Sequence, residues 1–194
     1  GGEVCALAFR NGEARAELAG PPDPRRPGRN LTLPVTVRRA KDGRGASVRI
    51  GAHQVELAAR THSDWIPLSF RAGWRGAIAG ICRLYLADAG PAFRLYVSPL
   101  HIDPARPALP ISHPPSYAPY LARLLGPFAT LGLAEDTWAL SEGALDEAAF
   151  LEQAWSIHAE RERMFFEALD RTRAGACVCV FDAPDRIQHM FTRE

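Results

Sequence analysis

Near the C-terminal end of the chain, an aspartate and a histidine stand four residues apart, at Asp185 and His189. On a helix, residues at this spacing share one face, so the carboxylate and the imidazole can approach the same ion. A carboxylate and a neutral imidazole suit a borderline divalent metal such as zinc. The alternative is a local pair at a helix start, in which the aspartate stabilises the positive end of the helix dipole.

The elements before this pair bear on its role. Residues 176–181 are wholly apolar, which predicts a short strand of the kind buried in a parallel sheet. A turn containing Pro184 follows, and Asp182 is predicted to cap the next helix rather than to act as a further ligand. A strand followed by a helix resembles one unit of a doubly wound sheet, and such sheets carry their chemistry beyond the carboxyl ends of the strands.

A long helix is predicted before the strand, starting after Asp146 as N-cap and ending at Gly175. Apolar residues recur along it at helical spacing. The charged run 160–163 is interpreted as a solvated face with i,i+3 and i,i+4 pairs. Arg161 falls on the apolar stripe, so its side chain is expected to snorkel or to reach inward.

The first hundred residues have the pattern of β structure. Residues 31–39 are rich in β-branched side chains, and two hairpins are expected, one over 46–58 and one joining 78–86 to 93–97. Residues 21–28 contain four prolines and predict a basic surface loop.

The chain therefore divides into three zones, and its fold class is α+β. Residues 1–100 are predicted to form a β-rich insertion or cap domain. Residues 101–144 form a proline-rich crossing segment with a short helix over 116–125. Residues 145–194 hold the long helix, the strand and the possible ligands, and would be one part of an incomplete α/β core.

Composition excludes several classes of protein. The net charge of +1 argues against a nucleic-acid polymer as partner, and no apolar run is long enough for a membrane segment. The four cysteines lack the spacing of a zinc knuckle and are expected to be small buried residues in a reducing compartment, which weakly favours the cytoplasm. The first residue is Gly1 and the first methionine is Met164, so we expect a piece of a longer protein.

Residues 185–191, Asp-Arg-Ile-Gln-His-Met-Phe, resemble the Asp-Arg-x-x-His-Met-Phe stretch of the type I phosphodiesterase/nucleotide pyrophosphatase-like family, within the alkaline phosphatase superfamily. The likeness covers most of the chain, because other landmarks occur in the same order. These are 20–24 (Gly-Pro-Pro-Asp-Pro), 63–65 (Ser-Asp-Trp), 95–99 (Leu-Tyr-Val-Ser-Pro), 103–104 (Asp-Pro), 110–112 (Pro-Ile-Ser) and 135–137 (Glu-Asp-Thr).

The resemblance implies an alkaline phosphatase-like α/β core with two divalent metals, zinc or manganese, and a Ser or Thr nucleophile. Asp185 and His189 would be two ligands of one metal. No residue of this chain matches the nucleophile or the remaining ligands, so no catalytic residue is assigned here. The parent would be a phosphoric ester hydrolase acting on a small phosphate ester, with core segments missing on both sides of this chain. The chain alone is expected to be inactive.

Two other functions remain open. One is a non-catalytic, β-rich binding module in which the terminal motif is a remnant, and the other is a phosphomutase of the same superfamily. Ser112-His113 is rejected as a nucleophile and base, because adjacent residues rarely orient each other correctly. The other histidines are expected to be structural or solvent-exposed. The tryptophans are expected in the core or at domain contacts, and they are Trp65, Trp74, Trp138 and Trp155.

Overall fold

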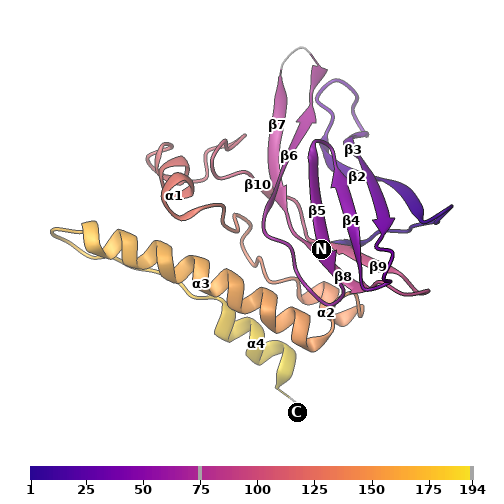
Figure 1. Cartoon of the computed structure of the whole chain (residues 1–194). Coiled ribbons are helices and arrows are strands. Elements are labelled where there is room, and N and C mark those ends of the chain that lie inside the picture. Colours follow the sequence, from indigo (N-terminus) through magenta and orange to yellow (C-terminus); the bar gives the residue numbers. More distant parts are fainter. Residues whose placement is uncertain (74–75, 193–194) are drawn as a thin grey trace.

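The structure is a computed structural model, and it describes residues 1–73 and 76–192. The chain has a mixed α+β fold, as predicted, with β structure in its first half and helices in its second half (Figure 1). Trp74 lies outside the described residues.

The largest sheet has four antiparallel strands in the order β2-β3-β4-β5. It confirms the strand predicted over residues 31–39, and it confirms the first hairpin, whose turn is Gly51-Ala52. Along β3, buried residues alternate with exposed ones, because one face of the strand covers the core. The strands are β2 (Glu13–Pro22), β3 (Asn30–Arg39), β4 (Gly45–Ile50) and β5 (His53–Ala58).

Two three-stranded sheets complete the β part, in the orders β1-β9-β8 and β10-β7-β6. The second hairpin exists, but its first strand is shorter than predicted: residues 78–86 are divided at Arg83 between two sheets. The strands are β1 (Glu3–Val4), β6 (Ile66–Arg71), β7 (Ala77–Cys82), β8 (Leu84–Asp88), β9 (Arg94–Val97) and β10 (His101–Ile102).

One apolar core lies between the three sheets. Every sheet contributes fully buried side chains to it, among them Val48, Phe70 and Leu95. Phe70 lies directly on Gly20, where a Cβ atom would meet the phenylalanine ring at 2.2 Å. The close contact of ring and backbone at this point therefore requires glycine.

Two short helices follow the sheets. The helix α1 (Tyr117–Leu125) confirms the helix predicted over 116–125 and ends at Gly126, whose φ of 88° suits glycine. The helix α2 (Thr137–Ser141) was not predicted; the Asp136 carboxylate caps it by accepting the backbone N–H of Ala139.

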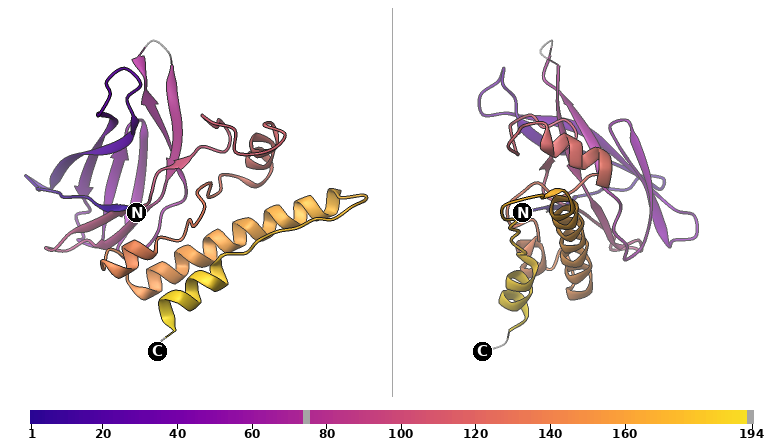
Figure 2. Two further views of the ribbon diagram at one scale, coloured as in Figure 1. Left: turned by 180° about the vertical axis from the view of Figure 1, so that it is seen from behind. Right: turned by 90° about the vertical axis from the view of Figure 1, so that its left-hand side faces the viewer.

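The long helix α3 (Glu147–Arg171) begins as predicted, with the Asp146 side chain accepting the backbone N–H of Ala149 at 2.9 Å. It ends at Arg171, before the predicted stop at Gly175. In Figures 1 and 2 this helix runs beneath the sheets, and its C-terminal half extends beyond them.

Glu160 holds α3 against the β part, and the interpretation of this residue as solvated was wrong. Its side chain is 3% exposed. One carboxylate oxygen accepts the indole N–H of Trp65 at 2.8 Å and the guanidinium of Arg83 at 3.0 Å, and the other accepts the backbone N–H of Ala129 at 2.8 Å. The Arg83 guanidinium also lies 4.6 Å from the Trp65 ring centroid. Sheet, loop and helix therefore meet at one carboxylate.

A second buried carboxylate connects the sheets to α2 and α3. Asp136 accepts the hydroxyl of Tyr96 at 2.7 Å, and its own backbone N–H donates to the Gln153 side chain at 2.8 Å. Burial and the nearby carboxylate raise the pKa of Tyr96 well above its ordinary value, so the phenol stays protonated and can donate.

The strand predicted over residues 176–181 is absent from the described part of the chain. This stretch is extended but pairs with no described strand, and it runs back along α3 (Figure 2). Cys177 and Cys179 share the more buried side, as their spacing predicts, whereas Val178 and Val180 are 85% and 68% exposed. The pattern is that of a strand, but the structure supplies no neighbour for it.

All four cysteines are free thiols, and only Cys82 is fully buried. Burial raises the pKa of Cys5 to about 11 and that of Cys82 to about 12. Among the helices that the structure describes, none has the length and apolar character needed to cross a membrane.

Candidate functional site

The predicted ligands lie on α4 (Ala183–Phe191), the last helix. Its start differs from the prediction: Asp182 precedes the helix but makes no side-chain cap hydrogen bond. Its carboxylate instead pairs with Arg161 of α3 at 2.9 Å. This partly exposed ion pair ties the start of α4 to the long helix, and it does not decide between the two alternatives for the Arg161 side chain.

Aromatic contacts hold α4 and the preceding segment on α3. The ring centroids of Phe191 and Phe150 are 6.1 Å apart. Phe181, just before the helix, lies 5.1 Å from His158 and 6.0 Å from Phe165. The helix therefore has a defined position, and its opposite face is turned to solvent.

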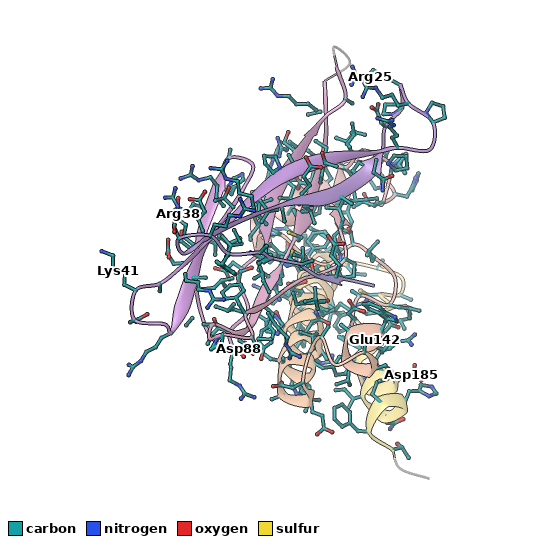
Figure 3. All side chains as sticks on the ribbon, turned by 90° about the vertical axis from the view of Figure 1, so that its right-hand side faces the viewer. Arg25, Arg38, Lys41, Asp88, Glu142 and Asp185 are labelled. Atoms are coloured by element: carbon teal, nitrogen blue, oxygen red, sulfur yellow. The ribbon has the colours of Figure 1, made fainter. Side chains whose placement is uncertain are left out.

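Asp185 and His189 share that solvent-facing side of α4, as their spacing predicts. The imidazole Nε2 of His189 lies 3.2 Å from a carboxylate oxygen of Asp185, and the side chains are 72% and 60% exposed. Figure 3 shows Asp185 on the outer surface of α4, away from the sheets. Asp185 occupies the first turn of the helix, where the macrodipole favours a carboxylate, and His189 occupies the last turn.

The geometry of this pair fits two ligands of one metal ion. Zinc–oxygen and zinc–nitrogen bonds of about 2.1 Å at a tetrahedral angle place the two donor atoms roughly 3.4 Å apart. The observed 3.2 Å separation is close to this span. Within the described residues, however, no group of three or more His, Cys, Asp or Glu side chains is arranged to hold a metal. The pair is at most half of a site.

Other histidines have structural surroundings, in agreement with the prediction. His101 is 2% exposed, and its Nδ1 accepts the backbone N–H of Thr130 at 3.0 Å. Burial, and secondly the charge of Arg83, lower the pKa of His101 to about 4. His62 contacts the carbonyl of Ala149 through Nε2 at 3.0 Å, and burial lowers its pKa too.

The rejected Ser112-His113 pair is part of a local turn. The Ser112 hydroxyl donates to the carbonyl of Pro114 at 2.9 Å and accepts the backbone N–H of Ala118 at 3.0 Å. His113 is exposed. These contacts engage the hydroxyl and leave no hydrogen bond between it and His113.

The tryptophans divide into two groups. Trp65 lies at the contact between the sheets and α3, as expected. Trp138 and Trp155 are 50% and 58% exposed, so the core alternative is wrong for both, and the alternative of a domain contact stays a prediction. Both lie on helices, where the sequence pattern does not say which face another element covers.

Comparison of the chain with protein-family models, with curated proteins and with solved structures found no match.

A pocket beside β3 and β6 was missed by sequence reasoning. Its lining combines apolar residues with polar ones, and it includes two arginines, Arg26 and Arg71. The available signal was weak: Arg26 belongs to the basic proline-rich loop, but Arg71 lies at the end of a strand far along the sequence.

Proposed function

We propose that Asp185 and His189 supply two ligands of a divalent metal site, with zinc or manganese as the metal, in a phosphoric ester hydrolase. The single observation that carries this proposal is the exposed carboxylate–imidazole pair, with 3.2 Å between donor atoms. The proposal includes a second metal. Residues outside this chain supply the remaining ligands of both metals and a Ser or Thr nucleophile. The substrate is a small phosphodiester, nucleotide pyrophosphate or phosphomonoester.

The metal would supply charge stabilisation at the phosphoryl oxygens. The role of this chain is to hold and orient the ligands. The His189 Nε2 faces the carboxylate, and the same nitrogen would turn to the ion when its proton is displaced. The ion pair of Arg161 with Asp182 fixes the first turn of α4 and thereby the position of Asp185.

Residues 176–181 support the same proposal. This segment has the side-chain alternation of a strand, with Val178 and Val180 on its exposed side, and it leads directly into α4. We propose that it becomes a strand of an alkaline phosphatase-like α/β sheet when neighbouring strands are present. The metal ligands would then lie just beyond its carboxyl end, where such sheets place their sites.

The test is titration of this chain with Zn²⁺ or Mn²⁺ by calorimetry. Two ligands should give weak binding, with a dissociation constant above about 10 μM. His189→Ala and Asp185→Asn should each weaken it by about tenfold or more. The matched control is His113→Ala, which removes an exposed histidine elsewhere and should change nothing.

Equal binding to the wild type and to both variants would contradict the proposal. Hydrolysis provides a second readout: the chain alone should not turn over nitrophenyl phosphate esters. The longer protein should do so, and a chelator should abolish the reaction. Full activity of the longer protein in the presence of the chelator would also refute the proposal.

A further inference from the structure

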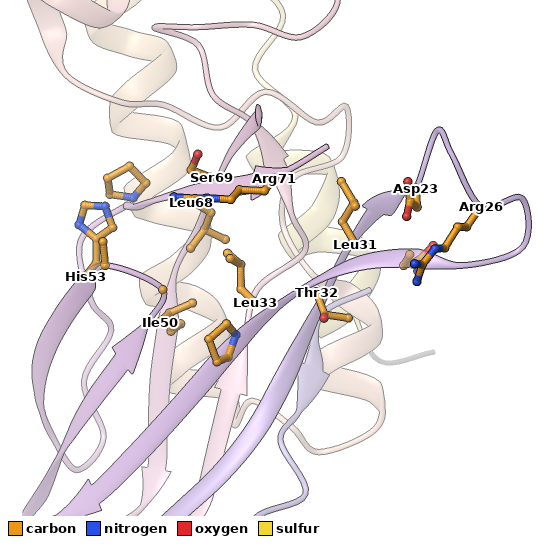
Figure 4. A pocket seen from close by; sticks show the side chains of 15 residues that line it. Asp23, Arg26, Leu31, Thr32, Leu33, Ile50, His53, Leu68, Ser69 and Arg71 are labelled. Atoms are coloured by element: carbon orange, nitrogen blue, oxygen red, sulfur yellow. The ribbon is translucent and has the colours of Figure 1, made fainter. Parts of the chain in front are cut away.

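A pocket of about 710 Å³ lies between β3, the β4–β5 turn and β6 (Figure 4). Its volume falls within the range of small-molecule sites, which is about 300–1,000 Å³. Its lining is mixed: Leu33 and Pro67 are half-buried and Pro34 is exposed, beside the polar residues Thr32 and Ser69, whereas Leu31, Ile50 and Leu68 are almost wholly buried in the core. The apolar surface that a ligand would cover is that of Leu33, Pro34 and Pro67.

Cationic side chains stand at the rim of this pocket. Arg26 comes from the loop after β2, and Arg71 is the last residue of β6. In Figure 4, Arg26 and His53 lie at opposite ends of the lining, and Arg71 lies between them. Neither arginine forms an ion pair with another residue in the described part of the chain.

The one carboxylate among the described lining residues is already engaged. Asp23 is 8% exposed; its carboxylate accepts the backbone N–H of Arg25 at 2.9 Å and lies 3.5 Å from the Arg25 guanidinium. Asp23 therefore does not neutralise Arg26 or Arg71. Two guanidinium groups without a counter-charge give the rim a positive potential, and their planar donor geometry matches carboxylate, sulfonate and phosphate.

We infer that this pocket binds a small organic anion with an apolar body. The apolar part lies on Leu33, Pro34 and Pro67, and the anionic group lies in the positive potential of Arg26 and Arg71. This site is separate from the Asp185–His189 pair, because α4 lies beneath the sheets, on α3 (Figure 1). The inference does not depend on the proposed phosphohydrolase function.

Two fluorescent probes test the inference. The first is 8-anilinonaphthalene-1-sulfonate, an anion with an apolar body, and the second is N-phenyl-1-naphthylamine, which lacks the sulfonate. Arg26→Ala and Arg71→Ala should each weaken binding of the anionic probe by about tenfold, the equivalent of one charge-assisted hydrogen bond. Both variants should leave binding of the neutral probe unchanged.

The matched control is Arg94→Ala, which removes an exposed strand arginine outside the pocket. This change should not affect either probe. Ser69→Phe, which introduces a ring at an exposed lining position on β6, should weaken both probes. All four positions are exposed, so the variants should keep the wild-type melting temperature.

Competition identifies the class of anion. Octanoate and octyl phosphate are added to the complex with the anionic probe, and displacement by either one supports the inference and assigns carboxylate or phosphate. The inference is overturned if neither competes, or if the arginine variants bind the anionic probe as tightly as the wild type. Tighter binding of the neutral probe than of the anionic probe would also overturn it.

Discussion

Individual buried polar residues determine how this chain responds to pH and to mutation. His101 and Glu160 lie within the contact between the sheets and the second half of the chain. Each accepts hydrogen bonds from the loop that follows α1, His101 from Thr130 and Glu160 from Ala129. Their effects should appear in stability, not in metal binding, because their hydrogen-bond partners lie in the β part and the loop after α1 and do not include Asp185 or His189.

His101 should make the protein less stable in mild acid. Its pKa is about 4 in the folded chain, against 6.5 ordinarily, because burial disfavours the charged ring. Between these values the unfolded chain takes up a proton that the folded chain does not, so the free energy of unfolding falls as the pH falls from 6.5 to 4. The loss should reach about 3 kcal/mol.

Denaturant unfolding at pH 7 and at pH 4.5 measures this effect. His101→Asn places an amide oxygen where Nδ1 accepts the Thr130 N–H, and it should remove most of the difference. His113→Asn, a change at an exposed histidine, should retain the full difference. An identical pH dependence in wild type and His101→Asn would show that His101 is not the responsible group.

Glu160→Gln should strongly destabilise the protein. The change removes the charge that compensates Arg83, whose side chain is 15% exposed. Burial lowers the pKa of Arg83 and Glu160 opposes this, but a guanidinium remains charged near neutral pH. An uncompensated buried charge costs about 3–5 kcal/mol. Glu162→Gln, on the exposed side of the same helix, is the control; a loss under 1 kcal/mol for Glu160→Gln would contradict this account.

At the scale of elements, local signals in the sequence were sufficient for α1 and for the start of α3, but not for α2. The cap at Asp146 and the stop at Gly126 are encoded by neighbouring residues, so α1 and the start of α3 could be predicted. The segment 176–181 could not, because a strand needs a partner and apolar composition does not show whether one is present. The same limit hid the burial of Glu160, whose partners Trp65 and Arg83 are distant in sequence.

The start of α3 gives a prediction at this scale. Asp146→Ala should cost about 1 kcal/mol of stability, because it removes a cap hydrogen bond. Asp146→Asn keeps an accepting oxygen and loses only the exposed ion pair with Arg60, so it should cost less. Denaturant unfolding measures both; equal losses would assign the effect to the ion pair.

For the molecule as a whole, the candidate sites could be predicted only in part. The spacing of Asp185 and His189 gave their shared face correctly, because four residues make about one helical turn. The pocket beside β6 combines Arg26 with Arg71, and only the paired sheets bring these residues to one rim.

The exposed edge at residues 176–181 predicts self-association. Val178 and Val180 are exposed, and their backbone pairs with no described strand, which is the condition for edge-to-edge contact between chains. Sedimentation should show association that increases with concentration. Val178→Lys should suppress it, whereas Leu109→Lys, at an exposed loop position, should not. Equal association of all three proteins would exclude this edge as the contact.

The two oxygens of the Glu160 carboxylate bind different parts of the chain, which has a consequence for unfolding. One oxygen is held by the sheets and the other by the loop at Ala129, so α3 cannot leave the sheets without also releasing the loop. Sheets, loop and the first half of α3 should therefore melt as one cooperative unit. Residues 173–192 pack on α3 through the Arg161–Asp182 ion pair and the aromatic contacts of Phe181 and Phe191. They can detach while this unit stays folded, which would make the unfolding of the chain a sequence of two transitions.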